Sequence, residues 1–155
     1  VVPDVMSTAK GIAGGVPCGL MMAKENVAKA FAPGDHASTF GGNPLATAAG
    51  NVVVDELLGG LLDNVKEQGA YLREQLEKVA QKHKDLVKDV RGMGLMQGIE
   101  LNKPAGPVVA KAIDLGLLLV GAGQFIIRFV PSLIVSKADI DTAMEILDKA
   151  LESAE

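Results

Sequence analysis

One lysine near the start of the chain lies in a segment of mostly small residues. Lys10 sits within Ser7–Gly19, and four of the residues that follow it in this segment are glycines. Because glycine has no side chain, a ligand or a second stretch of backbone can approach closely there. A primary amine held in such a place can act as a nucleophile. The alternative is that Lys10 is an ordinary solvated lysine in a turn.

A second glycine-rich segment, Gly34–Pro44, contains two neighbouring hydroxyl residues, Ser38 and Thr39. Small hydroxyl groups and backbone N–H groups in a glycine-flanked loop suit a phosphate, because no large side chain blocks its approach. The alternative is structural. Serine and threonine also cap helices, and a helix is expected to begin near Asn43–Pro44.

Arg128 lies in an apolar run, residues 125–130, that is predicted to form a strand. The two-residue period of a strand places Arg128 on the same side as Ile126 and Val130. A guanidinium among apolar neighbours pairs well with a planar anion, and a carboxylate offers it a bidentate fit. That carboxylate could belong to a bound substrate, or to an Asp or Glu of the protein in an internal salt bridge.

The elements that position these residues follow from hydrophobic spacing. Before residue 44 we expect only short elements, including a buried strand at residues 19–23. Pro44 suits the first turn of a helix, which Gly59–Gly60 then ends. A longer amphipathic helix follows from about residue 65, and His83 is expected at its exposed end.

The remaining sequence predicts short strands and two further helices. The expected elements are strands at 86–90 and 95–101, a helix at 108–115, a hairpin of runs 117–120 and 125–130, and a last helix opened by a capping-box sequence at 136–139. Together these elements predict an α+β fold, with a small, mainly antiparallel sheet and helices on one side of it.

Composition excludes several functional classes. The 155 residues have a net charge of −4 and no basic block, which argues against a nucleic-acid partner. No apolar run approaches the roughly 20 residues that span a bilayer, so no membrane partner is expected. The only two histidines, His36 and His83, are too far apart to predict a metal site. A single cysteine, Cys18, fits a reducing, cytoplasmic location.

Four segments together are similar to the class III, pyridoxal-phosphate-dependent aminotransferases. Ala9-Lys10-Gly11 with Gly15–Gly19 resembles the Schiff-base lysine segment of that family, and His36–Pro44 resembles the segment by which one subunit caps the cofactor phosphate of its neighbour. The resemblance continues through Val90–Leu101 and Ile127–Leu133. It covers essentially the whole chain, in order, but only the C-terminal part of such an enzyme.

The resemblance implies a role for each candidate residue. Lys10 would be the catalytic lysine and would bind pyridoxal 5'-phosphate. Thr39 would bind the cofactor phosphate of the neighbouring subunit of a homodimer, Ser38 would lie by the substrate, and Arg128 would hold a substrate carboxylate. The implied reaction moves an amino group from N-acetylornithine, or a related omega-amino compound, to 2-oxoglutarate, giving glutamate, in cytoplasmic arginine biosynthesis.

The resemblance also implies a division of the chain. Residues 1–44 would be a remnant of the large cofactor-binding domain of a fold-type I enzyme, and residues 45–155 its C-terminal small domain with the connecting helix. Only nine residues precede Lys10, so the aspartate, the stacking ring and the helix-end phosphate site that the family places before the lysine are not in this sequence. We therefore expect this chain alone to be inactive.

Two other classes of function stay open on the sequence. The chain could be a non-catalytic α+β module for association or binding that keeps the small domain without its chemistry. It could also bind a phosphate or a nucleotide through its glycine-rich loops. However, Gly121–Gly123 lacks the third glycine of a dinucleotide-binding motif, and Gly14-Gly15 is not followed by the Gly-Lys-Ser/Thr of a nucleotide-phosphate loop.

Overall fold

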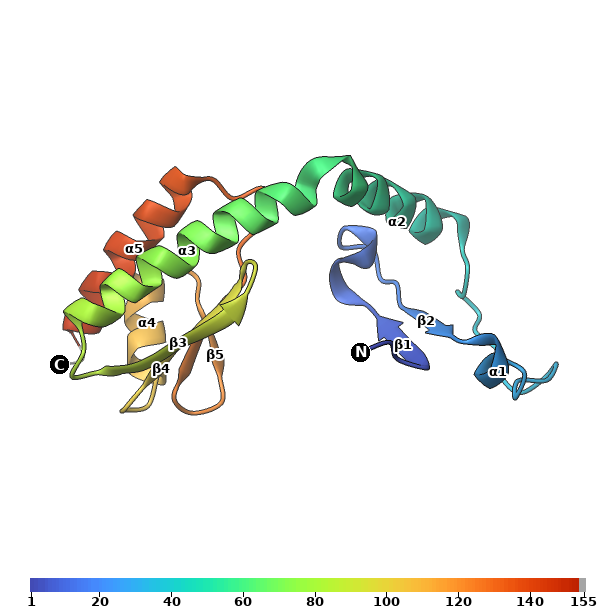
Figure 1. Cartoon of the computed structure of the whole chain (residues 1–155), viewed down its shortest axis with the longest axis horizontal. Helices are drawn as coiled ribbons and strands as arrows, with labels where there is room; N and C mark the ends of the chain where they lie inside the picture. Colours follow the sequence, from blue (N-terminus) through green and yellow to red (C-terminus); the bar gives the residue numbers. More distant parts are fainter. Residues whose placement is uncertain (154–155) are drawn as a thin grey trace. The chain divides into compact units, whose positions relative to one another are not determined.

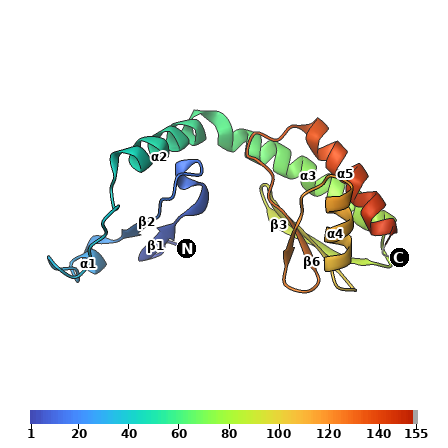
Figure 2. The same ribbon diagram turned by 180° about the vertical axis from the view of Figure 1, so that it is seen from behind.

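The computed structural model describes residues 1–153 and divides the chain into two compact units. The first unit is Val1–Gly60 and the second begins at Leu61. Figure 1 and Figure 2 show their elements from opposite sides. The boundary expected between residues 44 and 45 concerns the domains of a whole enzyme and stays a prediction.

The first unit is built from short elements. Strands β1 (Val5–Thr8) and β2 (Leu20–Ala23) pair antiparallel, and a 3-10 helix, Lys10–Ala13, lies in the connection between them. A single helical turn, α1 (Glu25–Ala28), and a long loop lead to α2 (Pro44–Glu56). Pro44 occupies the first turn of α2, as expected, where its missing N–H group is not needed.

The first unit buries very little apolar surface. Only Ala13 and Ala46 are buried in it, whereas large side chains from both strands and from α2 are exposed. The expectation of a buried strand at residues 19–23 is therefore wrong in one respect: β2 forms, but only Ala23 is even half-buried. The physical reason is that β1 is the only strand paired with β2, and the described residues leave their side chains uncovered.

A kink at Gly60 separates α2 from α3 (Leu62–Lys82). Gly60 has φ 125°, which lies outside helical geometry, inside a π-helical turn at Leu57–Leu61. Among residues 1–153, the combined helical stretch Pro44–Lys82 is long and apolar enough to cross a membrane by length and composition alone. The expectation that no apolar run approaches that length is corrected accordingly. Core helices of soluble proteins meet the same criterion, so the finding does not by itself indicate a membrane.

The second unit contains a four-stranded antiparallel sheet. Its strands are β3 (Val87–Met93), β4 (Met96–Leu101), β5 (Val120–Ala122) and β6 (Ile126–Phe129), in the spatial order β3-β4-β6-β5. The predicted hairpin is confirmed, because β5 and β6 pair antiparallel. Its turn is at residues 123–125 and not at 121–124, because Gly121 and Ala122 belong to β5, whereas residues 117–119 of the predicted first run are not in a strand. In β4 and β6 strict alternation sends every second side chain to the core, and a register shift between Val87 and Asp89 adjusts β3.

Three helices complete the second unit: α3, α4 (Gly106–Asp114) and α5 (Lys137–Glu152). They share one buried core with the sheet, to which its strands contribute Val90, Ile99 and Ile127 from the same face. Figure 1 shows the helices gathered against the sheet. The predicted α+β architecture, a small antiparallel sheet with helices on one side, is confirmed, as is the capping box that opens α5.

Helix α3 approaches the β3–β4 turn closely at two glycines. A Cβ atom added to Gly69 would lie 2.5 Å from the carbonyl carbon of Gly94. The same Gly94 carbonyl oxygen accepts a hydrogen bond of 2.7 Å from the buried Gln97 side chain. The backbone of the β3–β4 turn is therefore held by the Gln97 side chain of β4 and lies directly against α3 at Gly69. Neither backbone can easily shift to make room for a larger side chain at position 69.

We expect Gly69→Ala to destabilise the protein by about 1–3 kcal/mol, because overpacking against fixed backbone forces the helix off the sheet. Gly106→Ala, at the start of α4, is the matched control, since an added Cβ there meets nothing within 4 Å. Urea unfolding of both variants measures the difference. Equal stability of the two would show that the α3–turn contact adapts freely.

His83 ends α3, as predicted, but its side chain is buried and not exposed. Its Nε2 atom lies 2.7 Å from Asp148 Oδ1 on α5, and Lys82 donates a hydrogen bond of 2.5 Å to the other oxygen of the same carboxylate. Burial raises the pKa of Asp148, but the hydrogen bonds from Lys82 and His83 outweigh it, so the pKa is lowered. Sequence periodicity could not reveal this pairing, because its partner lies 65 residues away.

Replacing Asp148 by Asn is expected to cost about 1–2 kcal/mol at pH 7, because it removes the carboxylate that holds His83 and Lys82. Since the pKa of Asp148 is lower in the folded chain than in the unfolded chain, the difference is complete above about pH 5 and shrinks as the pH falls below about 4. Glu145→Gln, an exposed position on the same helix, is the control. Thermal unfolding from pH 3 to pH 7 tests this, and a difference independent of pH would contradict it.

Candidate functional site

Lys10 has an unusual backbone conformation. It begins the 3-10 helix Lys10–Ala13 with φ 65°, and it is the only non-glycine residue with positive φ among residues 1–153. A residue with a Cβ atom pays about 1–2 kcal/mol in this region, and such strain is concentrated at functional sites. The Lys10 side chain is exposed, and no residue from 1 to 153 forms a hydrogen bond or an ion pair with its amine.

Helix α2 supports the turn that presents Lys10. Gly50 on α2 approaches the carbonyl oxygen of Ile12, which a Cβ atom at Gly50 would meet at 3.5 Å. Gly14, with φ 61°, closes the turn through a hydrogen bond of 3.1 Å from its N–H group to the Gly11 carbonyl oxygen. The glycine-rich composition around Lys10 thus has local structural reasons, and it leaves the lysine side chain unobstructed.

Ser38 and Thr39 lie in the loop before α2, and both are exposed. The alternative that they cap α2 is wrong, because Asn43 is the N-cap: its side-chain oxygen accepts a hydrogen bond of 2.9 Å from the Ala46 N–H group. The hydroxyls of Ser38 and Thr39 have no hydrogen-bond partner in the described chain. Ser38 lines a hollow with Cys18 and Thr47, among others, whereas neither Lys10 nor Thr39 is part of that lining.

Arg128 lies in the second unit, on the face of the sheet that the helices leave open. It is exposed between the buried Ile127 and Phe129, on the side of Ile126, as predicted. The alternative of an internal salt bridge is wrong for the part of the chain that is described, because no carboxylate there pairs with Arg128. Its guanidinium is therefore available to an anion from outside this chain.

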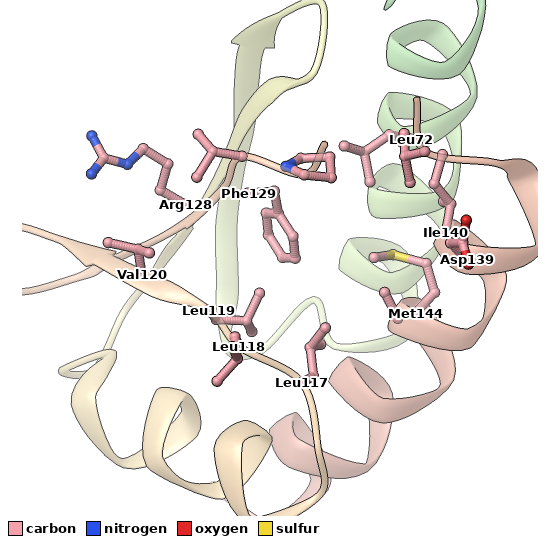
Figure 3. A pocket seen from close by; sticks show the side chains of 14 residues that line it. Leu72, Leu117, Leu118, Leu119, Val120, Arg128, Phe129, Asp139, Ile140 and Met144 are labelled. Carbon is pink, nitrogen blue, oxygen red and sulfur yellow. The ribbon is translucent and has the colours of Figure 1, made fainter. Parts of the chain in front are cut away.

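An apolar cavity of about 230 Å³ lies on the other side of the same strand. In Figure 3 Phe129 points into it together with Leu119 and Met144, whereas the Arg128 side chain extends away. The carboxylate of Asp139 at its rim accepts hydrogen bonds from Ser136, which lower the pKa of Asp139 and hold it in the cap of α5. Arg128 also belongs to the lining, but its guanidinium extends away from the cavity, and Asp139 is held by Ser136. Among the described residues no unpaired polar group therefore points into this cavity, and we do not assign it as the candidate site.

Sequence reasoning missed the charged neighbours of Arg128 on the open face. A hollow there is lined by Arg128, Arg91 and Met96, among others. Arg91 donates hydrogen bonds of 2.6 Å to Glu100 and of 2.6 Å to Asp89. These bonds, first that to Glu100 and then that to Asp89, raise the pKa of Arg91. Asp89 lies two residues before Arg91 on the same strand, whereas Glu100 lies on β4. Only the strand register could have indicated the pairing of Arg91 with Glu100.

The chemistry that these residues offer is that of unpaired donors. A primary amine, two hydroxyls and a guanidinium are exposed and have no partner within residues 1–153, in contrast to Arg91 and Lys82, which are held by carboxylates. The hydroxyls and the guanidinium can bind an anionic ligand, and the primary amine can react with a carbonyl compound. Within residues 1–153 no group of three or more His, Cys, Asp and Glu side chains is placed to hold a metal ion.

Comparison with known proteins assigns a family to this arrangement. The sequence profile described as Aminotransferase class-III matches residues 1–151. The acetylornithine aminotransferase of Caldanaerobacter subterraneus is 51% identical over 97% of this chain, and that of Thermosynechococcus vestitus is 50% identical over 97%. The chain spans 38% of the length of each of these curated relatives.

Solved structures agree with the sequence matches. The acetylornithine aminotransferase of Elizabethkingia anophelis superimposes with a TM-score of 0.87 at 30% identity, covering 99% of this chain and 40% of that protein. An ornithine aminotransferase of Plasmodium yoelii gives a TM-score of 0.88 at 31% identity, covering 100% of this chain and 42% of that one. The resemblance stated from the sequence is therefore confirmed, for the fold as well as for the family.

The strain at Lys10 predicts a difference between two variants that both lack the amine. Lys10→Gly should be more stable than Lys10→Ala by about 1 kcal/mol, because glycine adopts positive φ without a steric cost. Amide exchange of the Gly14 N–H group, which closes the turn, reports this locally. Faster exchange in Lys10→Gly than in Lys10→Ala would show that the turn is not strained.

Proposed function

The chain belongs to the class-III aminotransferases, and from that premise we propose that it is the C-terminal part of a pyridoxal-phosphate-dependent enzyme that transfers an amino group from N-acetylornithine to 2-oxoglutarate. The observation that carries the proposal is the unpaired amine of Lys10, held in a strained turn inside a family match that covers residues 1–151. The names of the relatives support acetylornithine over ornithine, succinylornithine or 4-aminobutyrate as the donor.

The residues of this chain fit pyridoxal phosphate. Lys10 would hold the cofactor through its amine, since no anion of the described part of the chain pairs with it. When bound, the cofactor supplies a conjugated ring that accepts electrons from the substrate's Cα. The free Lys10 amine would act as the base that takes the proton from that carbon, and the resulting ammonium would act as the acid that gives the proton up again. A primary amine can do both tasks, whereas the guanidinium of an arginine, which stays protonated, cannot.

Ser38 and Thr39 would act through their free hydroxyls. Thr39 would donate a hydrogen bond to the cofactor phosphate of the partner subunit, and Ser38 would lie by the substrate. The tight turn at this loop supports the assignment: the Gly41 N–H group donates to the Ser38 carbonyl oxygen at 3.3 Å, and a Cβ atom at Gly41 would lie 3.0 Å from that of Ser38. The turn is thus held by a hydrogen bond between backbone groups, so the hydroxyls of Ser38 and Thr39 are not needed to form it.

Arg128 would bind a carboxylate of 2-oxoglutarate or glutamate. The absence of an internal carboxylate partner in the described chain supports this role, because a guanidinium beside apolar neighbours such as Ile126 gains a bidentate pair only when an anion arrives. This interaction positions the substrate and does not itself move a proton.

The exposed apolar surface of the first unit supports the view that the complete enzyme is larger. Side chains such as Met21, Phe40 and Val52 are exposed, and two buried alanines cannot form an independent core. We propose that further sequence and a second subunit cover this surface in a cytoplasmic homodimer. The chain of 155 residues alone would then bind the cofactor weakly and would not transaminate. A non-catalytic association module is disfavoured, because it would not need the four unpaired polar groups.

The proposal is tested by locating the cofactor in the whole enzyme. After loading with pyridoxal phosphate and reduction with borohydride, which makes the link to the amine permanent, mass spectrometry of peptides is expected to find the label on Lys10. Lys10→Ala is the control and should retain none. A label on another lysine would overturn the assignment, and full turnover by the isolated 155-residue chain would refute its dependence on further sequence.

Arg128→Lys in the whole enzyme is expected to raise KM for 2-oxoglutarate roughly 10- to 100-fold, because a bidentate charged pair worth about 1.5–3 kcal/mol is lost. Arg73→Lys is the matched control, since Arg73 pairs with Glu77 on the surface of α3. Steady-state kinetics with varied 2-oxoglutarate measure the effect. An unchanged KM would show that Arg128 does not bind the substrate carboxylate.

A further inference from the structure

The open face of the sheet carries two adjacent rows of side chains across its strands. Direct partners in the first row are Arg91, Gly98 and Arg128, on β3, β4 and β6. The middle position, Gly98, contributes no side chain of its own, although the side chain of Ile126 lies close to it: a Cβ atom added at Gly98 would meet Ile126 Cγ2 at 3.3 Å. The two arginines lie two strands, or roughly 10 Å, apart. The second row, displaced by two residues along each strand, contains Asp89, Glu100 and Ile126.

Glu100 is consequently a diagonal neighbour of both arginines. Its direct partner on β6 is Ile126, two residues before Arg128, and its direct partner on β3 is Asp89, two residues before Arg91. Diagonal neighbours on one face are about 7–8 Å apart between Cα atoms, within reach of long side chains. Register alone therefore allows Glu100 to pair with either Arg91 or Arg128.

The structure shows which pair forms. Glu100 Oε2 accepts a hydrogen bond of 2.6 Å from Arg91 Nη2, and Arg91 Nη1 donates at 2.6 Å to Asp89. Arg91 thus holds two carboxylates at once, whereas Arg128 pairs with no carboxylate in residues 1–153. Asp89 is on the outer strand β3, two strands away from Arg128, so it is not the competitor that Glu100 could be.

We propose that Arg91 is a positioning residue for substrate binding: it sequesters Glu100, and so keeps the guanidinium of Arg128 free for the carboxylate of 2-oxoglutarate or glutamate. The inference rests on the proposed role of Arg128. Arg91 itself is not the substrate's partner in this proposal, because its positive charge is already offset by two carboxylates, those of Glu100 and Asp89. Without Arg91, Glu100 pairs with Arg128 and competes with the incoming carboxylate.

The competition has a calculable form. If Glu100 pairs with Arg128 in most molecules, the apparent affinity for a carboxylate ligand equals the intrinsic affinity multiplied by the fraction of molecules in which Arg128 is free. An exposed pair worth about 0.2–1 kcal/mol gives a weakening of about 2- to 6-fold. The rate of the chemical step in the saturated enzyme is not affected, because the saturating substrate displaces Glu100.

The test uses the whole enzyme and an unreactive dicarboxylate, glutarate, as the probe. Calorimetry is expected to show Arg91→Gln binding glutarate about 2- to 6-fold more weakly than the wild type. The double variant Arg91→Gln with Glu100→Gln should return to the wild-type affinity, since the competitor is gone. Steady-state kinetics should show the same pattern in KM for 2-oxoglutarate with kcat unchanged.

Two controls separate sequestration from a loss of structure. Asp89→Asn removes the other partner of Arg91 but frees no carboxylate near Arg128, so its glutarate affinity should equal that of the wild type. Arg91→Lys retains one positive charge for Glu100 and should recover much of the lost affinity. Failure of the double variant to recover would overturn the proposal, because Arg91 would then act through the fold and not through Glu100.

The same experiment distinguishes failure of the inference from failure of the proposed function. If Arg128→Lys binds glutarate as tightly as the wild type, Arg128 is not the carboxylate site and both ideas fall. If Arg128→Lys weakens binding while Arg91→Gln does not, the proposed function stands and the sequestration by Arg91 is refuted.

Discussion

Helices cover only one face of the four-stranded sheet, and the two-residue period of a strand therefore sorts the side chains of β4 and β6 into a core set and an open set. Ile99, Ile127 and Phe129 face the helices and are buried. Gly98 and Arg128 face the other way, next to a hollow that the helices do not reach. One constraint thus produces both the stability of the second unit and its candidate binding surface.

Charged groups in this protein fall into two classes. Arg91, Lys82 and Lys24 are each held by carboxylates of the same chain. Lys10 and Arg128 have no such partner among the described residues. An anionic ligand competes with any internal carboxylate for a cation, and Glu100, which is paired with Arg91, is the carboxylate that we propose is kept away from Arg128 in this way.

The two units differ in how far they depend on surfaces outside the chain. The second unit has a continuous core drawn from three helices and four strands. The first has only two buried alanines, although it holds the strained Lys10 turn. Strain of that kind persists only where surrounding structure fixes the backbone, and here α2 supplies part of that support through the close approach of Gly50.

The sequence by itself determined the local elements and the family. Pro44, the capping box at Ser136 and the apolar periodicity of α3 act over a few residues, so they could be read without coordinates. Tertiary structure alone decided the long-range facts: that His83 is buried against Asp148, that Asn43 and not Ser38 caps α2, and that Glu100 pairs with Arg91. The reason is physical. Periodicity fixes which face of an element a side chain occupies, but strand register and helix packing decide which distant or competing group it meets there.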